Sequence, residues 1–586
     1  MGFIDPTPPP FEYAEWRRRP HLERIRACAE DWALNGFGTP YFVYLLYVAK
    51  ILLYAVGGLL VISLTPGVGG LGDVGDWWTE PIVFQKAVIW TMLWEVLGLG
   101  AGSLPLTLRF SPMIGGVLYW LRPGTIRLPP WPDRVPFTRG TRRTPIDVAL
   151  YAGLTIAALY LLLSGGIDAA ATTAGRLDPV AVAVLLTLLG LLGLRDKVPF
   201  LAARAEIYGN LALIFLFPLT NMIVAAQLVF VCIWLGAASS KLNRHFPFVV
   251  TVMISNTPWN RWRAAKRRLY RDHPGDLRPS ATGALIAHFG TAMEFTLPLI
   301  LLLSRGGAIG TIAVAGMVLF HVHIFSTFPL AVPLEWNVFM IFGLLFLFGH
   351  YGATPFSSLD DPLLLAILAV SCVGLPVLGN FRPDLVSFLP SMRYYAGNWA
   401  TSQWLFRRDS GAEAKLDRDL VKAAPIVTEQ LAKSYDAELI EILVYKGLAF
   451  RSMHSHGRAL NGLVQRAVDD VDDYEVREGE LVAGVVLGYN FGDGHFHDQR
   501  LLAAVQERCG FEPGEVRIVA LESQPAHVQR QRYRIYDAAT GLVEAGWVNV
   551  ADMVERQPWL DERPFPVEVE VEGVGGEAEG RAATLA

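Results

Sequence analysis

The sequence predicts an all-α polytopic membrane bundle of about ten transmembrane helices with a C-terminal cytosolic α+β domain. Three observations predict this fold class. Of the 586 residues, 52 % are hydrophobic and only 18 % are charged, whereas a soluble domain carries about 25 % charged residues. The apolar residues fall into blocks of roughly 18–24, the length that crosses a bilayer core of about 30 Å. From about residue 382 the composition changes to that of a soluble protein.

The chain divides into four parts at these changes in composition. They are an N-terminal cytosolic segment (1–40), a transmembrane helical domain (41–381), a C-terminal cytosolic α+β domain (382–565) and a disordered acidic tail (566–586). The first part contains no apolar stretch typical of a signal peptide, so we expect no cleaved leader. The tail is acidic and rich in Gly and Ala, a composition that buries too little apolar surface to fold.

Ten spans are expected in the helical domain. They are 41–64, 82–103, 147–164, 179–194, 198–219, 222–240, 285–304, 307–330, 336–351 and 363–380. The fifth span is the least regular, because Arg204 and Glu206 interrupt it and Pro218 ends it.

The orientation follows from the distribution of Arg and Lys between the loops. Loop 104–146 contains seven arginines and loop 241–284 contains nine Arg and Lys residues, whereas loops 65–81 and 352–362 contain none. Cytoplasmic loops of membrane proteins carry the excess of positive charge. We therefore expect a multi-pass protein of the plasma membrane with both termini in the cytoplasm.

One part of the first basic loop, residues 111–136, is apolar, aromatic and basic but too short to span. This pattern is typical of a segment that lies in the membrane interface, with Trp120 and Trp131 at the level of the headgroups and arginines near anionic lipid. The alternative is a loop that packs on the cytosolic domain.

The cytosolic domain should begin with helices and continue as a mixed helix and strand pattern. We expect helices in 411–468, a strand in 479–490, a helix in 497–510, a strand in 515–523 and a hairpin in 531–550 that turns near Thr540.

Polar groups inside the predicted spans indicate where a functional site would lie. Lys50, Glu95, Glu294 and His321 fall within spans, where a charge costs a few kcal/mol and usually faces a cavity or a partner. With a rise of about 1.5 Å per residue, all four lie at a similar depth, as they would in one shared polar pocket. The alternative is that Lys50 and Glu95 form an ion pair that joins two helices. His323 is two residues from His321, so one helix cannot direct both at the same metal.

Lys241 follows a run of small residues, 236–240, at the cytoplasmic end of the sixth span. Small residues let helices or a ligand approach closely, and a desolvated lysine can lose its proton and act as a base. The alternative is a lysine that extends to the interface and only sets the topology. We take Lys241 and His321 as candidate catalytic residues. The candidate ligand-binding residues are Lys50, Glu95, Glu294, Asn243, His245 and Glu335.

A metal site is not expected. Asp493, His495 and His497 alternate in "GDGHFHD", and alternate residues of an extended segment share a face. We favour the other interpretation, a Gly-rich turn whose Asp or His caps the next helix. The four cysteines lie far apart and indicate neither a disulfide framework nor a zinc site.

Parts of the sequence resemble two known families of membrane proteins. The segments "GTPYFVYLLYVAK", "EPIVFQKAVIWTM", "SSKLNRHFPFV" and "VPLEWNVFMIFG" are similar to an actinobacterial family of multispanning membrane proteins of unknown function, and this resemblance covers residues 1–560. It implies no activity.

Residues 200–345 resemble the membrane core of the vitamin K-dependent carboxylase-like superfamily. The resemblance rests on Lys241-Leu242-Asn243, on Glu294 before Pro298, and on Phe320-His321 before Phe328-Pro329. It implies a lysine base toward a quinol, a role that would fall to Lys241. The chain departs from the family pattern, because "HFPF" replaces the usual Asp-Trp and no large luminal domain is present. An isoprenoid quinone or a lipid is therefore the expected cofactor class.

These observations predict a protein that binds a lipid- or quinone-like amphiphile in a polar pocket near the cytoplasmic leaflet. The first alternative is a membrane-embedded enzyme that uses Lys241 or His321 as a base on a quinol or lipid. The second is a scaffold for cell-envelope machinery. Expected partners are membrane lipid, an amphiphilic small molecule and a protein bound through the cytosolic domain. The net charge of −5 does not favour nucleic acid.

Overall fold

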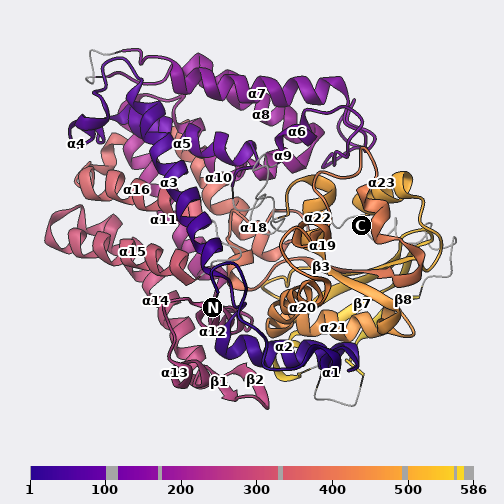
Figure 1. Cartoon of the computed structure of the whole chain (residues 1–586). Helices are drawn as coiled ribbons and strands as arrows, with labels where there is room; N and C mark the ends of the chain where they lie inside the picture. Colours follow the sequence, from indigo (N-terminus) through magenta and orange to yellow (C-terminus); the bar gives the residue numbers. More distant parts are fainter. Residues whose placement is uncertain are drawn as a thin grey trace.

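The computed structural model describes residues 2–100, 116–168, 174–327, 334–490, 499–557, 559 and 564–572. Helices of the first two thirds of the chain form one side of the molecule, which we call the helical region (residues 41–381). The last third contains the main sheet and forms the other side, which we call the C-terminal region (residues 382–572) (Figure 1).

Six helices of the helical region, among the described residues, are long and apolar enough to cross a membrane. They are α3 (Tyr41–Ser63), α7 (Pro145–Leu163), α11 (Leu219–Ser240), α14 (Ala281–Ser304), α15 (Gly307–Thr327) and the helix Pro362–Phe381, which comprises α17 (Pro362–Leu368), a π-helical turn and α18 (Leu375–Phe381). Each matches a predicted span. The chain is therefore a transmembrane protein with several spanning helices.

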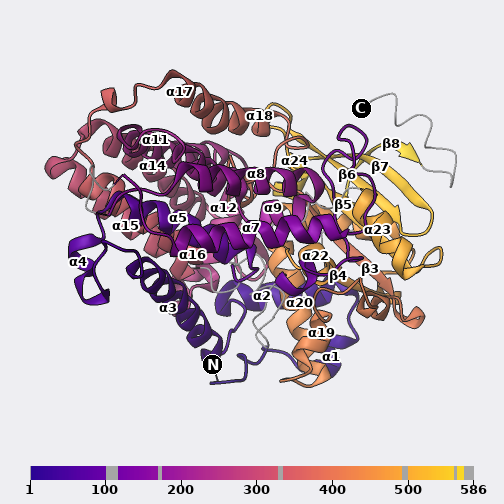
Figure 2. The same ribbon diagram turned by 90° about the horizontal axis from the view of Figure 1, so that it is seen from above.

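The other four predicted spans form shorter helices, so the number ten remains a prediction. They correspond to α5 (Pro81–Val96), α8 (Pro179–Arg195), the pair α9 (Lys197–Ala202) and α10 (Ala205–Ile214), and α16 (Leu334–Leu344), which continues as a π-helix to His350. The fifth span is broken at Arg204, whose φ of 48° is left-handed. Nearly every side chain of α5 is buried, so this helix lies inside the bundle. Figure 2 shows α7 and α8 side by side.

The C-terminal region is built on a six-stranded antiparallel sheet in the order β4-β3-β5-β6-β7-β8. The strands are β3 (Thr401–Arg407), β4 (Tyr474–Glu478), β5 (Val516–Leu521), β6 (Arg530–Asp537), β7 (Gly541–Asn549) and β8 (Glu568–Glu572). The helices are α19 (Val427–Leu431), α20 (Ala437–Met453), α21 (Ser455–Ala467), α22 (Gly479–Leu487), α23 (Gln499–Cys509) and α24 (Val550–Glu555).

Several predicted elements of this region are confirmed. The hairpin is β6 and β7, the strand in 515–523 is β5, and the helix in 497–510 is α23, which is followed by Gly510 at a φ of 60°.

Two other predictions for this region are wrong. The expected strand in 479–490 is the buried helix α22. A short apolar run does not distinguish a buried strand from a buried helix. The tail was expected to be disordered from residue 566, but its alternating Val and Glu residues continue the sheet as β8.

The N-terminal segment and the loop 241–284 pack against the C-terminal region. The N-terminal helices are α1 (Tyr13–Arg17) and α2 (His21–Asn35), and α2 lies along α20. The loop folds into α12 (Phe246–Asn256), α13 (Arg263–Arg267) and the hairpin of β1 (Tyr270–Asp272) with β2 (Asp276–Pro279). Lys446 of α20 forms a buried ion pair with Asp31 of α2 at 2.7 Å. Segments far apart in sequence thus form one packed unit.

The first basic loop also packs on the C-terminal region. The short helix α6 (Val117–Trp120) places Trp120 in a fully buried position, where its Nε1 donates to the carbonyl oxygen of Leu487 at 2.9 Å. Arg142 of the same loop pairs with Glu507 at 2.6 Å. The prediction that Trp120 lies among lipid headgroups is wrong, and the alternative of a loop packed on this region is confirmed. The other short helix, α4 (Val74–Trp77), lies in the loop between α3 and α5.

Candidate functional site

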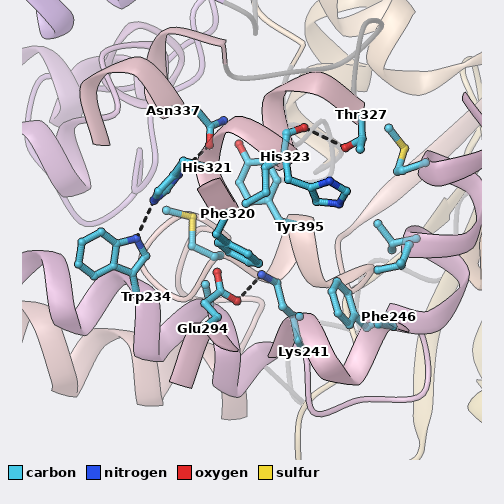
Figure 3. A pocket seen from close by; sticks show the side chains of 18 of the residues that line it. Trp234, Lys241, Phe246, Glu294, Phe320, His321, His323, Thr327, Asn337 and Tyr395 are labelled. Atoms are coloured by element: carbon cyan, nitrogen blue, oxygen red, sulfur yellow. Dashed lines mark hydrogen bonds and ion pairs between the residues drawn. The ribbon is translucent and has the colours of Figure 1, made fainter. Parts of the chain in front are cut away.

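A cavity of about 170 Å³ lies between α11, α12, α14, α15 and α16 of the helical region, and Met392 and Tyr395 of the C-terminal region complete its wall (Figure 3). Its walls are mostly apolar and include aromatic and methionine side chains. These are Trp234, Phe246, Phe320, Trp336, Tyr395, Met253, Met340 and Met392. Methionine fills irregular space and adapts to different shapes. Small residues on two helices, Ala237 and Gly290, widen the space.

The main polar feature of the wall is an ion pair between Lys241 and Glu294. Lys241 is the residue at which α11 ends, and Glu294 lies in the middle of α14. The ammonium donates to Oε2 of Glu294, and both side chains are buried. The Lys241 Nζ also lies 5.4 Å from the ring centroid of Phe246 and 5.9 Å from that of Phe320. Within the described residues, Lys241 is the hydrogen-bonding partner of Glu294.

His321 lines the same cavity, and its two ring nitrogens are both engaged by protein groups. The indole Nε1 of Trp234 donates to Nε2 of His321 at 3.1 Å. Because an indole N–H can only donate, Nε2 accepts and the ring proton lies on Nδ1. Nδ1 then donates to Oδ1 of Asn337 at 2.9 Å. His321 is therefore a neutral, oriented side chain, and its lone pair is already occupied.

Figure 3 shows both polar groups pointing into the same space from different helices. The exposed His323 lies at the rim, where its ring centroid is 6.1 Å from that of Trp259. His321 is buried and His323 is exposed, so the two histidines border the cavity at different depths.

Lys50, Glu95 and Glu335 belong to a second polar cluster. Lys50 pairs with Glu335 at 2.6 Å, and Trp94 Nε1 donates to the same Glu335 oxygen at 3.3 Å. Glu95 pairs with Arg204 at 2.8 Å. The alternative of a Lys50–Glu95 ion pair is wrong, because each of these residues pairs with a different side chain. None of these charged residues is among the described side chains that line the cavity.

The two clusters are neighbours. Trp336 lines the cavity on one side, and the Arg204 guanidinium lies 5.4 Å from its ring centroid. The single polar layer expected from the depths of the residues is therefore divided into two clusters by packed side chains.

Asn243 and His245 have structural partners away from the cavity. Oδ1 of Asn243 accepts from the backbone N–H groups of His245 and Phe246, both at 2.8 Å, and so caps α12. The His245 ring hydrogen-bonds Ser455 and Gln524 of the C-terminal region, each at 2.8 Å. Burial lowers the pKa of His245 to about 4. This histidine joins the two regions of the molecule.

Three residues that matter to the site were missed in the sequence. Trp234 and Asn337 orient His321, and Arg204 is the partner of Glu95. Asn337 and Arg204 could have been recognised from the sequence, because Asn337 is two residues from Glu335 and Arg204 interrupts a predicted span. Trp234 could not, because a tryptophan in an apolar run is common in spanning helices.

The metal candidates Asp493, His495 and His497 lie outside the described residues. In the part of the chain that the structure describes, no three His, Cys, Asp or Glu side chains are grouped as a metal site would require.

Comparison with known proteins identifies one family. The family described as "Transmembrane protein of unknown function (DUF3556)" matches residues 1–570. The chain belongs to this family. No curated protein and no solved structure gives a significant match. Membership of a membrane family of unknown function is thus confirmed, whereas the actinobacterial origin and the carboxylase-like resemblance gain no support from these comparisons.

Proposed function

We propose that this member of the DUF3556 family binds an amphiphile whose uncharged, oxygen-bearing head enters the cavity, as the head of an isoprenoid quinone or a neutral lipid would. The observation that carries the proposal is a buried Lys241–Glu294 pair at the wall of an otherwise apolar space. Removing two charges from water is costly, and their attraction repays this only when the remaining polar atoms also find partners. A ligand that borders the pair would supply such a partner.

The charge of the wall favours a neutral head. One cation and one anion cancel, and the hydrogen bonds of His321 hold it neutral. A carbonyl oxygen would accept from Lys241, and a hydroxyl would donate to Glu294. An anionic head would add an uncompensated charge in a site of low dielectric constant.

The size of the cavity sets a second limit. About 170 Å³ holds one ring or a short polar head rather than a whole lipid. The tail would leave past the exposed Ile286 and His323 at the rim, along the apolar outer faces of α14 and α15.

The test uses the full-length protein in nanodiscs. A benzoquinone with one short alkyl chain should quench the fluorescence of Trp234 and Trp336, and a monoacylglycerol should compete. We expect Glu294→Gln to weaken quinone binding at least tenfold (about 1.4 kcal/mol). The matched control is Glu507→Gln, which changes an exposed carboxylate paired with Arg142. Absence of saturable binding by both probes, or an equal loss in the two variants, contradicts the proposal.

The geometry gives less support to an enzyme that uses His321 or Lys241 as a base. Trp234 occupies the lone pair that His321 would need, and the Lys241 ammonium already donates to Glu294. Turnover of a bound quinol by the wild type, abolished in Lys241→Met, would reverse this preference. The scaffold alternative leaves the cavity without a role.

We further propose that the N-terminal segment, loop 241–284 and the C-terminal region all lie in the cytoplasm at the plasma membrane. Their mutual packing supports one common side, and the arginines of these loops favour the cytoplasmic side. In intact cells, a cysteine at Gly70 should react with a membrane-impermeant reagent and a cysteine at Arg267 should not. The reverse labelling contradicts the orientation.

A further inference from the structure

Five exposed arginines lie within eleven residues, on and next to α13 and β1. They are Arg261, Arg263, Arg267, Arg268 and Arg271. In the described part of the chain, two of them hydrogen-bond neutral groups, Tyr41 Oη and Asn35 Oδ1, and none forms an ion pair with a carboxylate.

Several exposed arginines elsewhere in the molecule pair with carboxylates. Arg122 lies 2.7 Å from Asp419, Arg142 lies 2.6 Å from Glu507 and Arg382 lies 2.7 Å from Asp384. Other exposed arginines without a described ion pair, such as Arg18, Arg19 and Arg134, occur in smaller numbers in each segment. The segment 261–271 carries five, and a surface with this density of positive charge is complementary to an anionic partner.

Two exposed tryptophans lie at the start of this segment, Trp259 before the first arginine and Trp262 between Arg261 and Arg263. Trp259 is 59 % exposed and Trp262 is 66 % exposed. Trp259 Nε1 donates to Ser326 Oγ at 3.0 Å, near the end of α15, and Arg261 reaches Tyr41 at the start of α3. The segment therefore lies at the ends of two spanning helices, where tryptophan and basic residues meet lipid headgroups. Figure 1 shows α13 and the β1–β2 hairpin at the lower edge of the molecule, next to α14.

A buried lysine holds this surface in place. Lys266 lies among the arginines in sequence but points inward, and its Nζ donates to the carbonyl oxygen of Ser255 at 2.6 Å. Ser255 also hydrogen-bonds Tyr270 at 2.7 Å. These contacts tie α13 to α12 and to β1, so the arginines stay on the outer side without a ligand.

We propose that the segment from Trp259 to Arg271 is a binding surface for the headgroups of anionic phospholipids. The tryptophans and the adjacent span ends favour a membrane over a nucleic acid or an acidic protein. The surface also borders the cavity, because Trp259 contacts His323 at the rim. The proposal is independent of the cavity ligand and holds whether or not a quinone binds.

The test compares lipids and charge variants of the full-length protein in a non-ionic detergent. Native mass spectrometry counts bound phosphatidylglycerol and phosphatidylcholine at matched concentrations. We expect preferential binding of phosphatidylglycerol that weakens with salt. The double variant Arg267→Gln/Arg268→Gln should lose about tenfold in affinity, since each basic group near an anionic membrane surface contributes measurably.

Two controls separate charge from fold. Arg530→Gln/Arg532→Gln removes the same charge from the sheet, where both arginines face carboxylates of β8, and should keep the lipid preference. Arg267→Lys/Arg268→Lys keeps the charge and should also keep binding. Equal binding of the two lipids, an unchanged Gln variant, or an equal loss in the sheet control overturns the proposal.

Discussion

The two polar clusters of the helical region contain the same kinds of residue and differ in what surrounds them. Lys50, Glu95, Arg204 and Glu335 form two ion pairs among packed side chains, with Trp94 and Trp336 against them. Lys241 and Glu294 form one ion pair that borders a cavity. A buried charge in a spanning segment is therefore a sign either of a structural pair or of a binding site. A cavity next to the pair indicates a binding site, whereas packed side chains around it indicate a structural pair.

The largest expected effect lies in the packed cluster. Replacing Arg204 by Met leaves Glu95 buried without its ion-pair partner, which typically costs about 3–5 kcal/mol. Unfolding of the purified protein in mixed micelles measures this loss. The double variant Glu95→Gln/Arg204→Met should recover much of it. Strictly additive losses would show that the pair does not act as a unit.

Two buried histidines sharpen the comparison, because they are buried without charge: His245, which joins the two regions, and His454 of the C-terminal region. Burial lowers the pKa of His454 to about 3, and the pKa of His245 to about 4. Both values lie below the unfolded value of about 6.5, so the unfolded state binds more protons as the pH falls below that value. Stability should decrease as the pH falls below about 6.5, down to about pH 4 for His245 and about pH 3 for His454, by roughly 1.4 kcal/mol per histidine at pH 5.5.

The pH dependence of the unfolding free energy measures this contribution. His245→Gln and His454→Gln should each flatten the curve in the same window. An unchanged slope in both variants would show that these histidines do not govern acid sensitivity.

At the cavity wall, an Arg substitution should separate binding from stability. Lys241→Arg keeps the positive charge, but guanidinium is bulkier and does not deprotonate. We expect at least a tenfold loss of quinone affinity with little change in unfolding free energy, because the cavity accommodates the larger group. Lys50→Arg should show the reverse pattern, since its site is packed. Full binding by Lys241→Arg would mean that this lysine only sets the topology.

The smallest expected effect comes from one methyl group. A Cβ at Gly290 would meet a ring carbon of Phe320 at 3.9 Å, an ordinary contact at the cavity wall. Gly290→Ala should stabilise α14 by about 0.5–1 kcal/mol through helix propensity and should weaken quinone binding a few fold. Gly190→Ala in α8 is the matched control, because its Cβ meets no atom within 4 Å. Equal binding in the two variants would place the ligand away from Gly290.

Local patterns in the sequence were sufficient to predict the long spanning helices and the β6–β7 hairpin. Long apolar runs predicted the spans that became α3, α7, α11, α14 and α15, because crossing a bilayer demands length and apolarity from each segment alone. Alternating residues around a turn predicted the β6–β7 hairpin. Helix α22 was missed because it is buried on all sides, so its sequence has no distinguishing period.

The sequence by itself determined that this is a transmembrane protein with polar side chains inside its spans, where burial of a charge is unfavourable. It also identified Lys241, Glu294 and His321 as candidate site residues. Only the tertiary structure decided which charges pair. Glu95 and Arg204 are 109 residues apart, and Lys50 and Glu335 come from opposite ends of the helical region. Depth along a helix follows from residue number, but the direction in which a side chain points follows from packing. For that reason Lys241, Glu294 and His321 share a cavity, whereas Lys50, Glu95 and Glu335 lie in the packed interior.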